Sequence, residues 1–167
     1  VLLGPLADKM EPKRILIGSF LLTGIGCGLL LLFTESTSLF LLMASLGILG
    51  FGRIGQRVGE IARVFGMKVV AYDPYLPAEI FAKNEATSMS IAEVCEVADF
   101  VTIHMPLNDE TRNLFNAESI SKMKPDAVVL NMARGGIVNE KDMYEALVAG
   151  KIGGYATDVM ENEVAGD

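Results

Sequence analysis

The stretch Leu46 to Asp73, LGILGFGRIGQRVGEIARVFGMKVVAYD, decides the fold of this chain. It begins with the apolar run 46–49, which is long enough for a buried strand, and continues with a helical pattern that Gly66 ends. The run 68–72 predicts a second strand, with Asp73 at its tip. A strand, a helix and a strand in this order predict a β-α-β unit.

The helical pattern in this unit predicts which side of the helix is buried. Apolar residues recur at helical spacing on one face, and polar residues lie largely on the other face. The apolar face consists of Ile54, Val58, Ile61, Ala62 and Phe65, and the polar face of Gln56, Arg57, Glu60 and Arg63. We therefore expect the first set to pack against the sheet.

Three glycines before and inside this helix, Gly50, Gly52 and Gly55, have the spacing G-x-G-x-x-G. In a dinucleotide-binding loop the first allows a tight turn, the second lets a pyrophosphate approach the backbone, and the third lets helix and strand pack closely. The N–H groups and the dipole at the helix N-terminus favour the phosphates. Such glycines also occur as simple loop residues, but the flanking strand and helix favour a dinucleotide site.

Asp73 follows Gly55 by 18 residues, where a dinucleotide-binding unit needs an acceptor for the ribose hydroxyls. A carboxylate at this position repels the 2′-phosphate of NADP, because both groups are negatively charged. The sequence therefore predicts NAD as the cofactor, rather than NADP.

The composition of the 167 residues argues against some classes of function. The net charge is −7 at pH 7, and residues 1–45 carry three basic and three acidic side chains, so the remainder carries the whole net charge. Such an acidic body has no basic stripe for phosphates, which argues against nucleic-acid binding. Cys27 and Cys95 have no metal-ligand spacing, so we expect reduced, buried thiols, without a disulfide or a metal site.

Residues 1–45 predict a hydrophobic leader, and the mean hydropathy of the chain is accordingly high, at +0.40. Residues 15–33, ILIGSFLLTGIGCGLLLLF, carry no charge over 19 positions, which is the length that a membrane-spanning helix needs. Basic residues before this run and Glu35 after it place its N-terminal side in the cytoplasm. We therefore expect a transmembrane-like helix, with membrane contact through residues 15–33.

The residues before this run, GPLADKMEPKR at 4–14, resemble a cytoplasmic loop of major-facilitator transporters. The matching positions are Gly4, Leu6, Asp8, Lys9, Lys13 and Arg14, whereas Glu11 and Pro12 depart from the pattern. A generic hydrophobic anchor with a basic flank is the alternative. Since a single crossing puts the dinucleotide domain on the side where NAD is scarce, we expect a junction near Ser45 between segments that did not evolve as one protein.

After Asp73 the sequence alternates between helical and strand patterns. The expected helices are 78–83, 90–97, 116–122 and 139–149, and the expected strands are 100–103, 127–131 and 154–157. Ser90 and Glu93 have the spacing of a capping box. With the first two strands this makes about five, so the predicted class is α/β, a Rossmann-like, doubly wound parallel sheet after an apolar, helical leader.

Five ordered segments carry the motifs of one enzyme family. They are LGILGFGRIG (46–55), AYDP (71–74), HMPLNDETRNLFN (104–116), MKPDAVVLNMARGGIVNE (123–140) and ALVAGKIGGYATDVMENE (146–163). Through them, residues 46–167 resemble the NAD-binding domain of the D-isomer-specific 2-hydroxyacid dehydrogenases, in the branch of phosphoglycerate dehydrogenase and hydroxypyruvate reductase. The resemblance implies an NAD-dependent oxidoreductase that acts on a small 2-hydroxy or 2-oxo acid, with a homodimer as the family's assembly.

The same resemblance assigns roles to individual residues. The cofactor contacts it implies are Gly50, Gly52, Arg53, Ile54 and Gly55 at the pyrophosphate, Asp73 at the ribose, Met105, Met132 and Ala133 beside the nicotinamide, and Asp158 at the carboxamide. Arg134 is the implied catalytic arginine, whose fork would hold a substrate carboxylate and polarise the carbonyl. Glu163 is the implied partner of the catalytic histidine, although Val164 stands where the family usually has proline.

His104 is the sole histidine, and the resemblance places it in the H-x-P-L turn rather than at the catalytic base. We expect the family's catalytic histidine segment and substrate-binding domain to be missing, so residues 46–167 form a C-terminally truncated domain. Three hypotheses stay open: a cytoplasmic NAD-dependent oxidoreductase, a catalytically inactive NAD-binding fragment, and a membrane-anchored chimeric fragment with the α/β part as a passenger.

Overall fold

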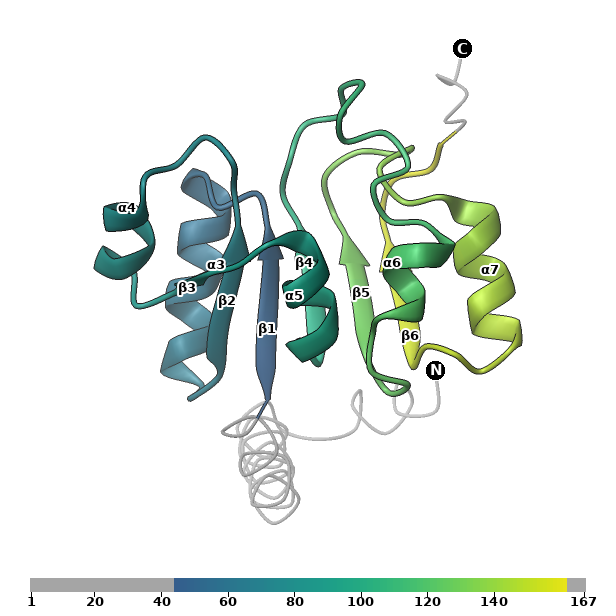
Figure 1. Ribbon diagram of the computed structural model, residues 1–167, viewed down its shortest axis with the longest axis horizontal. Helices are drawn as coiled ribbons and strands as arrows, with labels where there is room; N and C mark the ends of the chain where they lie inside the picture. The colour runs from purple at the N-terminus through teal and green to yellow at the C-terminus, as the bar shows by residue number, and fades with distance from the viewer. Residues whose placement is uncertain (1–43, 162–167) are drawn as a thin grey trace, which may run out of the picture. The chain divides into compact units, whose positions relative to one another are not determined.

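The structure is a computed structural model that describes residues 44–161, and these form a six-stranded parallel sheet between helices (Figure 1). The strands are β1 (Ser45–Leu49), β2 (Lys68–Tyr72), β3 (Thr87–Ser88), β4 (Phe100–Ile103), β5 (Val128–Asn131) and β6 (Gly154–Thr157). The helices are α3 (Arg53–Val64), α4 (Ala78–Lys83), α5 (Ile91–Val97), α6 (Ala117–Ser121) and α7 (Glu140–Val148). The predicted α/β class, with a Rossmann-like parallel sheet, is confirmed.

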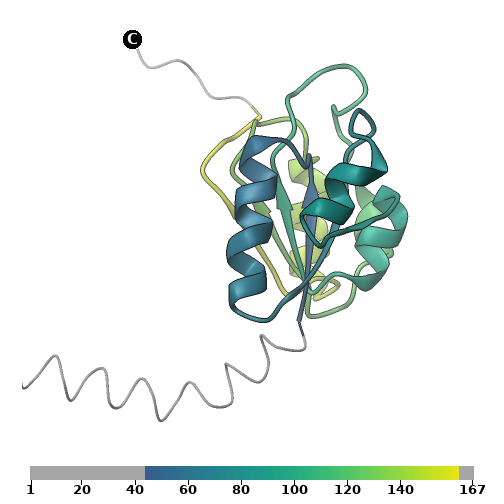
Figure 2. The same ribbon diagram turned by 90° about the vertical axis from the view of Figure 1, so that its left-hand side faces the viewer.

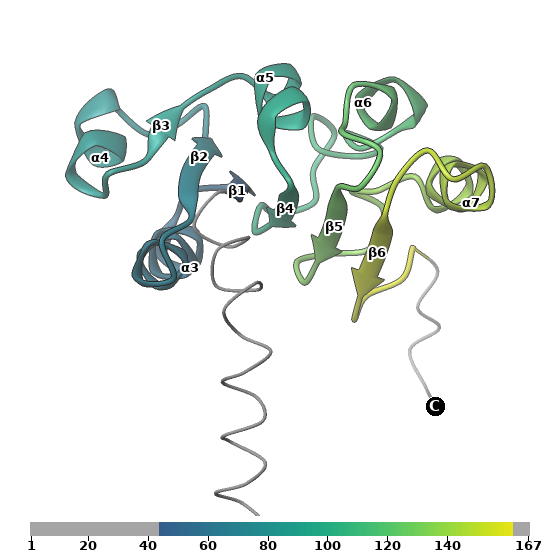
Figure 3. The ribbon, with the colours of Figure 1, turned by 90° about the horizontal axis from the view of Figure 1, so that it is seen from below.

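The strand order is β3-β2-β1-β4-β5-β6, and every neighbouring pair is parallel. The chain runs outward from β1 to β3 and then crosses back to β4 on the other side of β1. Helix α3 consequently covers one face of the sheet, and α5, α6 and α7 cover the other (Figures 2 and 3). The first strand of the β-α-β unit thus lies inside the sheet, at the point where the strand order reverses.

Both faces of the sheet are buried, as a parallel sheet requires. Ile48 and Leu49 are adjacent on β1, and neither has any exposed surface. Ile48 belongs to an apolar cluster with Phe51 and Phe81, whose rings stack with centroids 5.2 Å apart. Leu49 belongs to the larger cluster on the opposite face. This explains why the first strand is a continuous apolar run rather than an alternating one.

Strand β3 was not expected from the sequence, which predicted about five strands. It consists of Thr87 and Ser88, which pair with Val70 and Ala71 of β2. Both of its residues are exposed, so no apolar run marks it. A strand at the sheet's edge with no buried side chain cannot be recognised from hydrophobic pattern alone.

Helix α3 packs only in part through the predicted face, of which Ala62 is buried and Val58 packs against the cluster of Ile48. Its buried residues are Gly55, Gly59 and Ala62, whereas Ile54, Ile61 and Phe65 are 66%, 48% and 60% exposed. A Cβ atom at Gly55 would lie 2.3 Å from the carbonyl oxygen of Gly50. The helix therefore approaches the sheet through its glycines, and most of the predicted apolar face points away from it.

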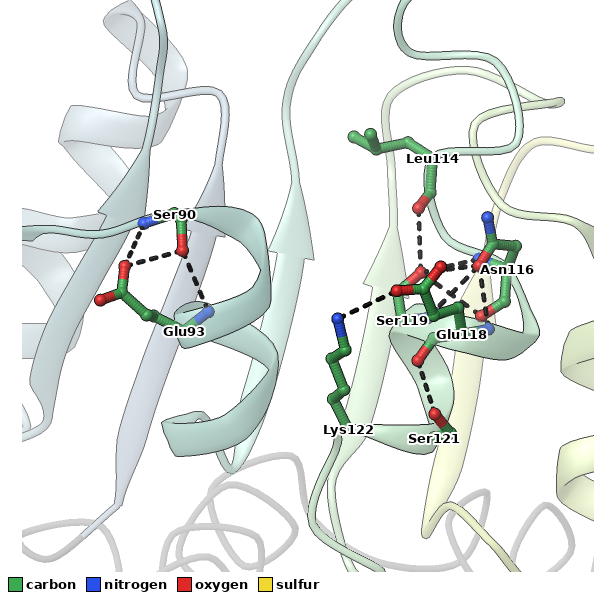
Figure 4. Close-up of polar contacts among 8 residues, drawn as sticks. All are labelled: Ser90, Glu93, Leu114, Asn116, Glu118, Ser119, Ser121 and Lys122. Atoms are coloured by element: carbon green, nitrogen blue, oxygen red, sulfur yellow. Dashed lines mark hydrogen bonds and ion pairs between the residues drawn. The ribbon is translucent and has the colours of Figure 1, made fainter.

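The predicted capping box at α5 is confirmed (Figure 4). The backbone N–H of Glu93 donates to Ser90 Oγ at 3.3 Å, and the N–H of Ser90 donates to Glu93 Oε2 at 2.8 Å. Asn116 caps α6 in the same way, with Ser119 as its partner. These caps fix where the two helices begin on the α5 side of the sheet.

No helix within residues 44–161 is long and apolar enough to cross a membrane. The predicted transmembrane-like helix at residues 15–33 lies outside the described residues, as does Cys27. Cys95 is a free, buried thiol, as expected.

Candidate functional site

A cleft of about 200 Å³ opens at the carboxyl ends of β1, β2 and β4. We call it the carboxyl-end cleft, and it is lined by Gly50, Gly52, Tyr72, Asp73, Pro74, Tyr75, Ile91, His104, Met105, Pro106, Asn108, Glu110, Thr111 and Leu114. Ligands of open α/β sheets bind at the carboxyl ends of the strands, where the strand order reverses. This cleft is in that position.

A wider hollow, of about 630 Å³, opens at the other end of the strands. Its lining includes Ser45, Arg63, Lys68 and Glu85, and it contains none of the predicted site residues. We assign the functional site to the smaller carboxyl-end cleft, because only that cleft combines the glycine-rich turn with the acid at the tip of β2.

The glycine-rich turn is built for close backbone contact. Gly50 has φ +91°, and a Cβ atom there would lie 2.8 Å from the carbonyl carbon of His104. Its N–H donates to the carbonyl of Tyr72 at 2.8 Å. Gly50 is therefore required where the ends of β1, β2 and β4 converge.

Gly52 stands at the N-cap of α3 and leaves space in front of the helix. A Cβ atom at Gly52 would meet nothing within 4 Å, and no side chain caps the helix. The first turn contains no acidic residue and begins with Arg53, whose side chain is exposed. An uncapped helix N-terminus with an adjacent cation can bind a phosphate group.

Asp73 connects the turn with the tip of β2. Its Oδ2 accepts a hydrogen bond from the N–H of Phe51 at 2.9 Å, and its Oδ1 accepts one from the N–H of Tyr75 at 3.0 Å. A carboxylate oxygen has more than one lone pair, so both oxygens can still accept from hydroxyl groups in the cleft. The structure thus brings Gly50, Gly52 and Asp73 together, as the motif predicted.

His104 lies on the β4 side of the carboxyl-end cleft and is half-buried. Its Nε2 is 3.0 Å from Thr102 Oγ1, and burial lowers the pKa of the imidazole. The ring is therefore neutral at pH 7. Met105 also lines the cleft, but it is only 6% exposed and packs into the larger apolar cluster.

The remaining predicted site residues do not line the carboxyl-end cleft. Met132, Ala133 and Arg134 follow β5, and Asp158 follows β6, so they lie at the same edge of the sheet. Met132, Arg134 and Asp158 are exposed. Glu163 lies outside the described residues. Ile54 is largely exposed on α3.

Asn131, which sequence reasoning did not single out, shapes the loop that carries Arg134. It is 1% exposed; its Nδ2 donates to the carbonyl of Arg134 at 2.9 Å, and its Oδ1 accepts from the N–H of Ala133 at 3.2 Å. An asparagine at the end of a buried strand is the sequence signal that could have identified it.

Gly135 and Glu140 hold the segment after β6 against the same loop. A Cβ atom at Gly135 would lie 1.9 Å from the carbonyl oxygen of Met160. The N–H of Glu161 donates to Glu140 Oε1 at 2.7 Å. Met160 and Glu161 therefore lie directly beside the arginine loop and the start of α7.

Comparisons with known proteins agree with this geometry. Residues 37–166 match the family model "D-isomer specific 2-hydroxyacid dehydrogenase, NAD binding domain". A D-3-phosphoglycerate dehydrogenase of Methanocaldococcus jannaschii is 46% identical over 121 residues, which are 71% of this chain and 23% of that protein. A hydroxypyruvate reductase of Thermotoga maritima is 41% identical over 123 residues, which are 74% of this chain and 39% of that protein.

Solved structures show the same similarity. A crystal structure of a D-lactate dehydrogenase from Aquifex aeolicus, complexed with NAD and lactic acid, superposes with a TM-score of 0.70 at 36% identity, covering 74% of this chain and 37% of that one. This chain thus spans well under half the length of these relatives. The comparisons do not support the transporter resemblance of residues 1–45, and the family match already begins at residue 37.

Proposed function

Because this chain belongs to the D-isomer specific 2-hydroxyacid dehydrogenases, whose NAD-binding domain it carries, we propose that it holds NAD for hydride transfer. The proposed substrate is a small 2-hydroxy or 2-oxo acid. The observation that carries the proposal is the carboxyl-end cleft, which joins the uncapped N-terminus of α3 to Asp73 across Gly50 and Gly52. The names of the relatives support this substrate class.

The geometry supports a specific way of holding the cofactor. The pyrophosphate would lie in front of Gly52, where the free space, the helix dipole and Arg53 all favour it. Asp73 would accept hydrogen bonds from the adenosine ribose. Gly55 allows α3 to come this close to the sheet, and Ile54 borders the phosphates through its backbone.

The nicotinamide end is proposed to lie toward β5 and β6. Met105, Met132 and Ala133 would provide its apolar surroundings, and Asp158 would contact the carboxamide. Bound NAD supplies the hydride acceptor. Arg134 would hold the substrate carboxylate and polarise the reacting carbonyl through paired N–H donors, and Glu163 would orient a histidine base.

His104 favours a second candidate function, in which the chain binds NAD without turnover. It is the only histidine of the sequence, and its ring contacts Thr102 of the preceding strand β4. A general base must reach the hydroxyl proton of the substrate. Turnover of NAD with D-lactate, glycerate or phosphoglycerate by the purified chain would support the first function, and saturable binding without turnover would support the second.

The remaining expectations concern the assembly and the location of the chain. A homodimer, a cytoplasmic location and a membrane contact through residues 15–33 stay predictions of the sequence.

Titration of the purified chain with NADH tests the proposed function. The chain contains no tryptophan, so the cofactor fluorescence is read without overlap from indole. We expect saturable binding, weakened at least about tenfold by Asp73→Ala, since hydrogen bonds to a charged group contribute about 1.5–3 kcal/mol. A folded sample, verified by circular dichroism, that does not bind NADH would contradict the proposal.

A further inference from the structure

Two loops that are far apart in the sequence meet at the mouth of the carboxyl-end cleft. Tyr75 belongs to the loop after β2, and Glu110 belongs to the loop after β4; both loops rise from the same edge of the sheet (Figure 1). The hydroxyl of Tyr75 donates to Glu110 Oε2 at 3.0 Å. Both residues line the cleft, so this contact closes part of its rim.

Glu110 is held by a tight turn rather than by an extended, free loop. Asn108 Oδ1 accepts hydrogen bonds from the N–H groups of Glu110, at 3.0 Å, and of Thr111, at 2.9 Å. Thr111 Oγ1 donates to the carbonyl of Pro106 at 2.7 Å. The backbone that presents the Glu110 carboxylate is therefore fixed.

Tyr75 is in turn connected to Asp73, whose Oδ1 accepts its N–H at 3.0 Å. Tyr75 thus links two carboxylates along the rim: its backbone N–H donates to Asp73, and its hydroxyl donates to Glu110. The lining of the cleft contains no lysine or arginine, and the imidazole of His104 is neutral at pH 7. The charge that a ligand meets in this cleft is therefore negative, and it comes from two different loops.

We propose that Glu110, held in place by Tyr75, is a second residue that selects NAD over NADP, acting from the β4 loop while Asp73 acts from the tip of β2. The inference rests on the proposed function, because it requires the adenosine part of the cofactor to occupy this cleft. Free ribose hydroxyls can donate to carboxylates, whereas a 2′-phosphate carries negative charge and only repels them. Two carboxylates enlarge that repulsion compared with Asp73 alone.

The test compares the dissociation constants of NADH and NADPH for the whole chain, measured by cofactor fluorescence. We expect Glu110→Gln to raise the ratio of the NADPH affinity to the NADH affinity by about three- to tenfold, as the loss of one water-screened charge would do. Tyr75→Phe keeps the ring but releases the carboxylate, so it should shift the ratio in the same direction by a smaller factor. Higher salt should reduce both shifts.

Asp109→Asn is the matched control. It removes the same charge from the neighbouring position of the same loop, but Asp109 does not line the cleft, so we expect the NADPH to NADH ratio to stay unchanged. An unchanged ratio of NADPH to NADH affinity in Glu110→Gln would overturn the inference, and so would an equal shift in Asp109→Asn. NADH binding by the parent chain would uphold the proposed function in either case. Absence of NADH binding by the parent chain would overturn both.

Discussion

The backbone N–H of Phe51 donates a 2.9 Å hydrogen bond to Oδ2 of Asp73, which lies 22 residues further along the chain. This bond attaches the glycine-rich turn to the tip of β2, so Asp73 supports the cleft as well as facing into it. The two roles can be separated, because an asparagine oxygen can still accept the Phe51 N–H whereas an alanine cannot.

Substitutions of Asp73 are expected to affect stability and binding differently. Asp73→Ala should lower the free energy of unfolding by about 1–2 kcal/mol, because a part-buried N–H loses its acceptor. Asp73→Asn should lower the free energy of unfolding by less than half as much as Asp73→Ala, although both variants should weaken NADH binding. Urea denaturation followed by circular dichroism measures the stabilities. Equal losses in the two variants would show that the Phe51 hydrogen bond does not contribute.

Alanine at the two turn glycines should affect two different properties, cofactor binding at Gly52 and stability at Gly50. Gly52→Ala should leave the stability unchanged, since its Cβ meets nothing within 4 Å, but weaken NADH binding at least about tenfold by occupying the phosphate position. Gly50→Ala should cost about 2–3 kcal/mol of stability, because it combines φ +91° with a 2.8 Å contact to the backbone of His104. Thermal unfolding and NADH titration of both variants check this, and a stable Gly50→Ala would refute the assignment of strain.

Gly135→Ala should detach the segment after β6 from the arginine loop. The new Cβ would lie 1.9 Å from the carbonyl oxygen of Met160, so the backbone must move, and the bond between the Glu161 N–H and Glu140 should break. Hydrogen exchange should accelerate at residues 159–161. Gly150→Ala is the control: its Cβ meets nothing within 4 Å, so its backbone strain, at φ +64°, should leave exchange at residues 159–161 unchanged.

Cys95 should make the stability fall at alkaline pH. Burial raises the pKa of its thiol from 9.0 to about 11. Because the unfolded chain loses this proton first, the contribution of the protonated thiol is complete below pH 9 and is lost as the pH rises to 11. The free energy of unfolding that is lost in this way is about 2–3 kcal/mol. Urea unfolding should show that the free energy of unfolding decreases less between pH 8 and pH 11 in Cys95→Ala than in the parent chain. Equal decreases in the two proteins would argue against this role of the Cys95 thiol.

Asp99 should contribute stability that disappears in acid. Partial burial raises the pKa of Asp99, but hydrogen bonds from Lys124 Nζ and from the N–H of Ser45 outweigh this effect and lower it below its usual value. The contribution is present above the unfolded pKa and is lost as the pH falls through the folded pKa. Asp99→Asn should cost about 1 kcal/mol at pH 7, after allowance for the partial exposure of the pair, and less at pH 3. A constant difference across this range, in urea unfolding, would contradict the role of the charge.

Most elements of the fold were predictable from the sequence, because hydrophobic period and caps mark them locally. Strands β2, β4 and β6 and helix α4 have the predicted bounds, and the other predicted elements differ by one residue at one end or at both. The apolar pattern predicted the buried face of α3 only at Val58 and Ala62. Gly55 and Gly59 add nothing to that pattern, yet they are what allows the helix to approach the sheet.

The candidate site was predictable only where a motif encodes it. Gly50, Gly52 and Asp73 meet in one cleft because a β-α-β unit brings their positions together. The contact between Tyr75 and Glu110 depends on the conformations of two loops, which no local pattern specifies. The roles of Arg134 and Glu163 stay predictions that rest on the family resemblance.

The strand order also determines how this sheet can form on the ribosome. β1 precedes the other five strands in the sequence, yet it ends up between β2 and β4, and its Leu46 pairs with Phe100, 54 positions later. At about 5–20 residues per second, one side of β1 has no partner strand for roughly 3–10 s of synthesis. The length of the crossover from β2 to β4 therefore sets how long the nascent chain presents an open apolar strand to chaperones.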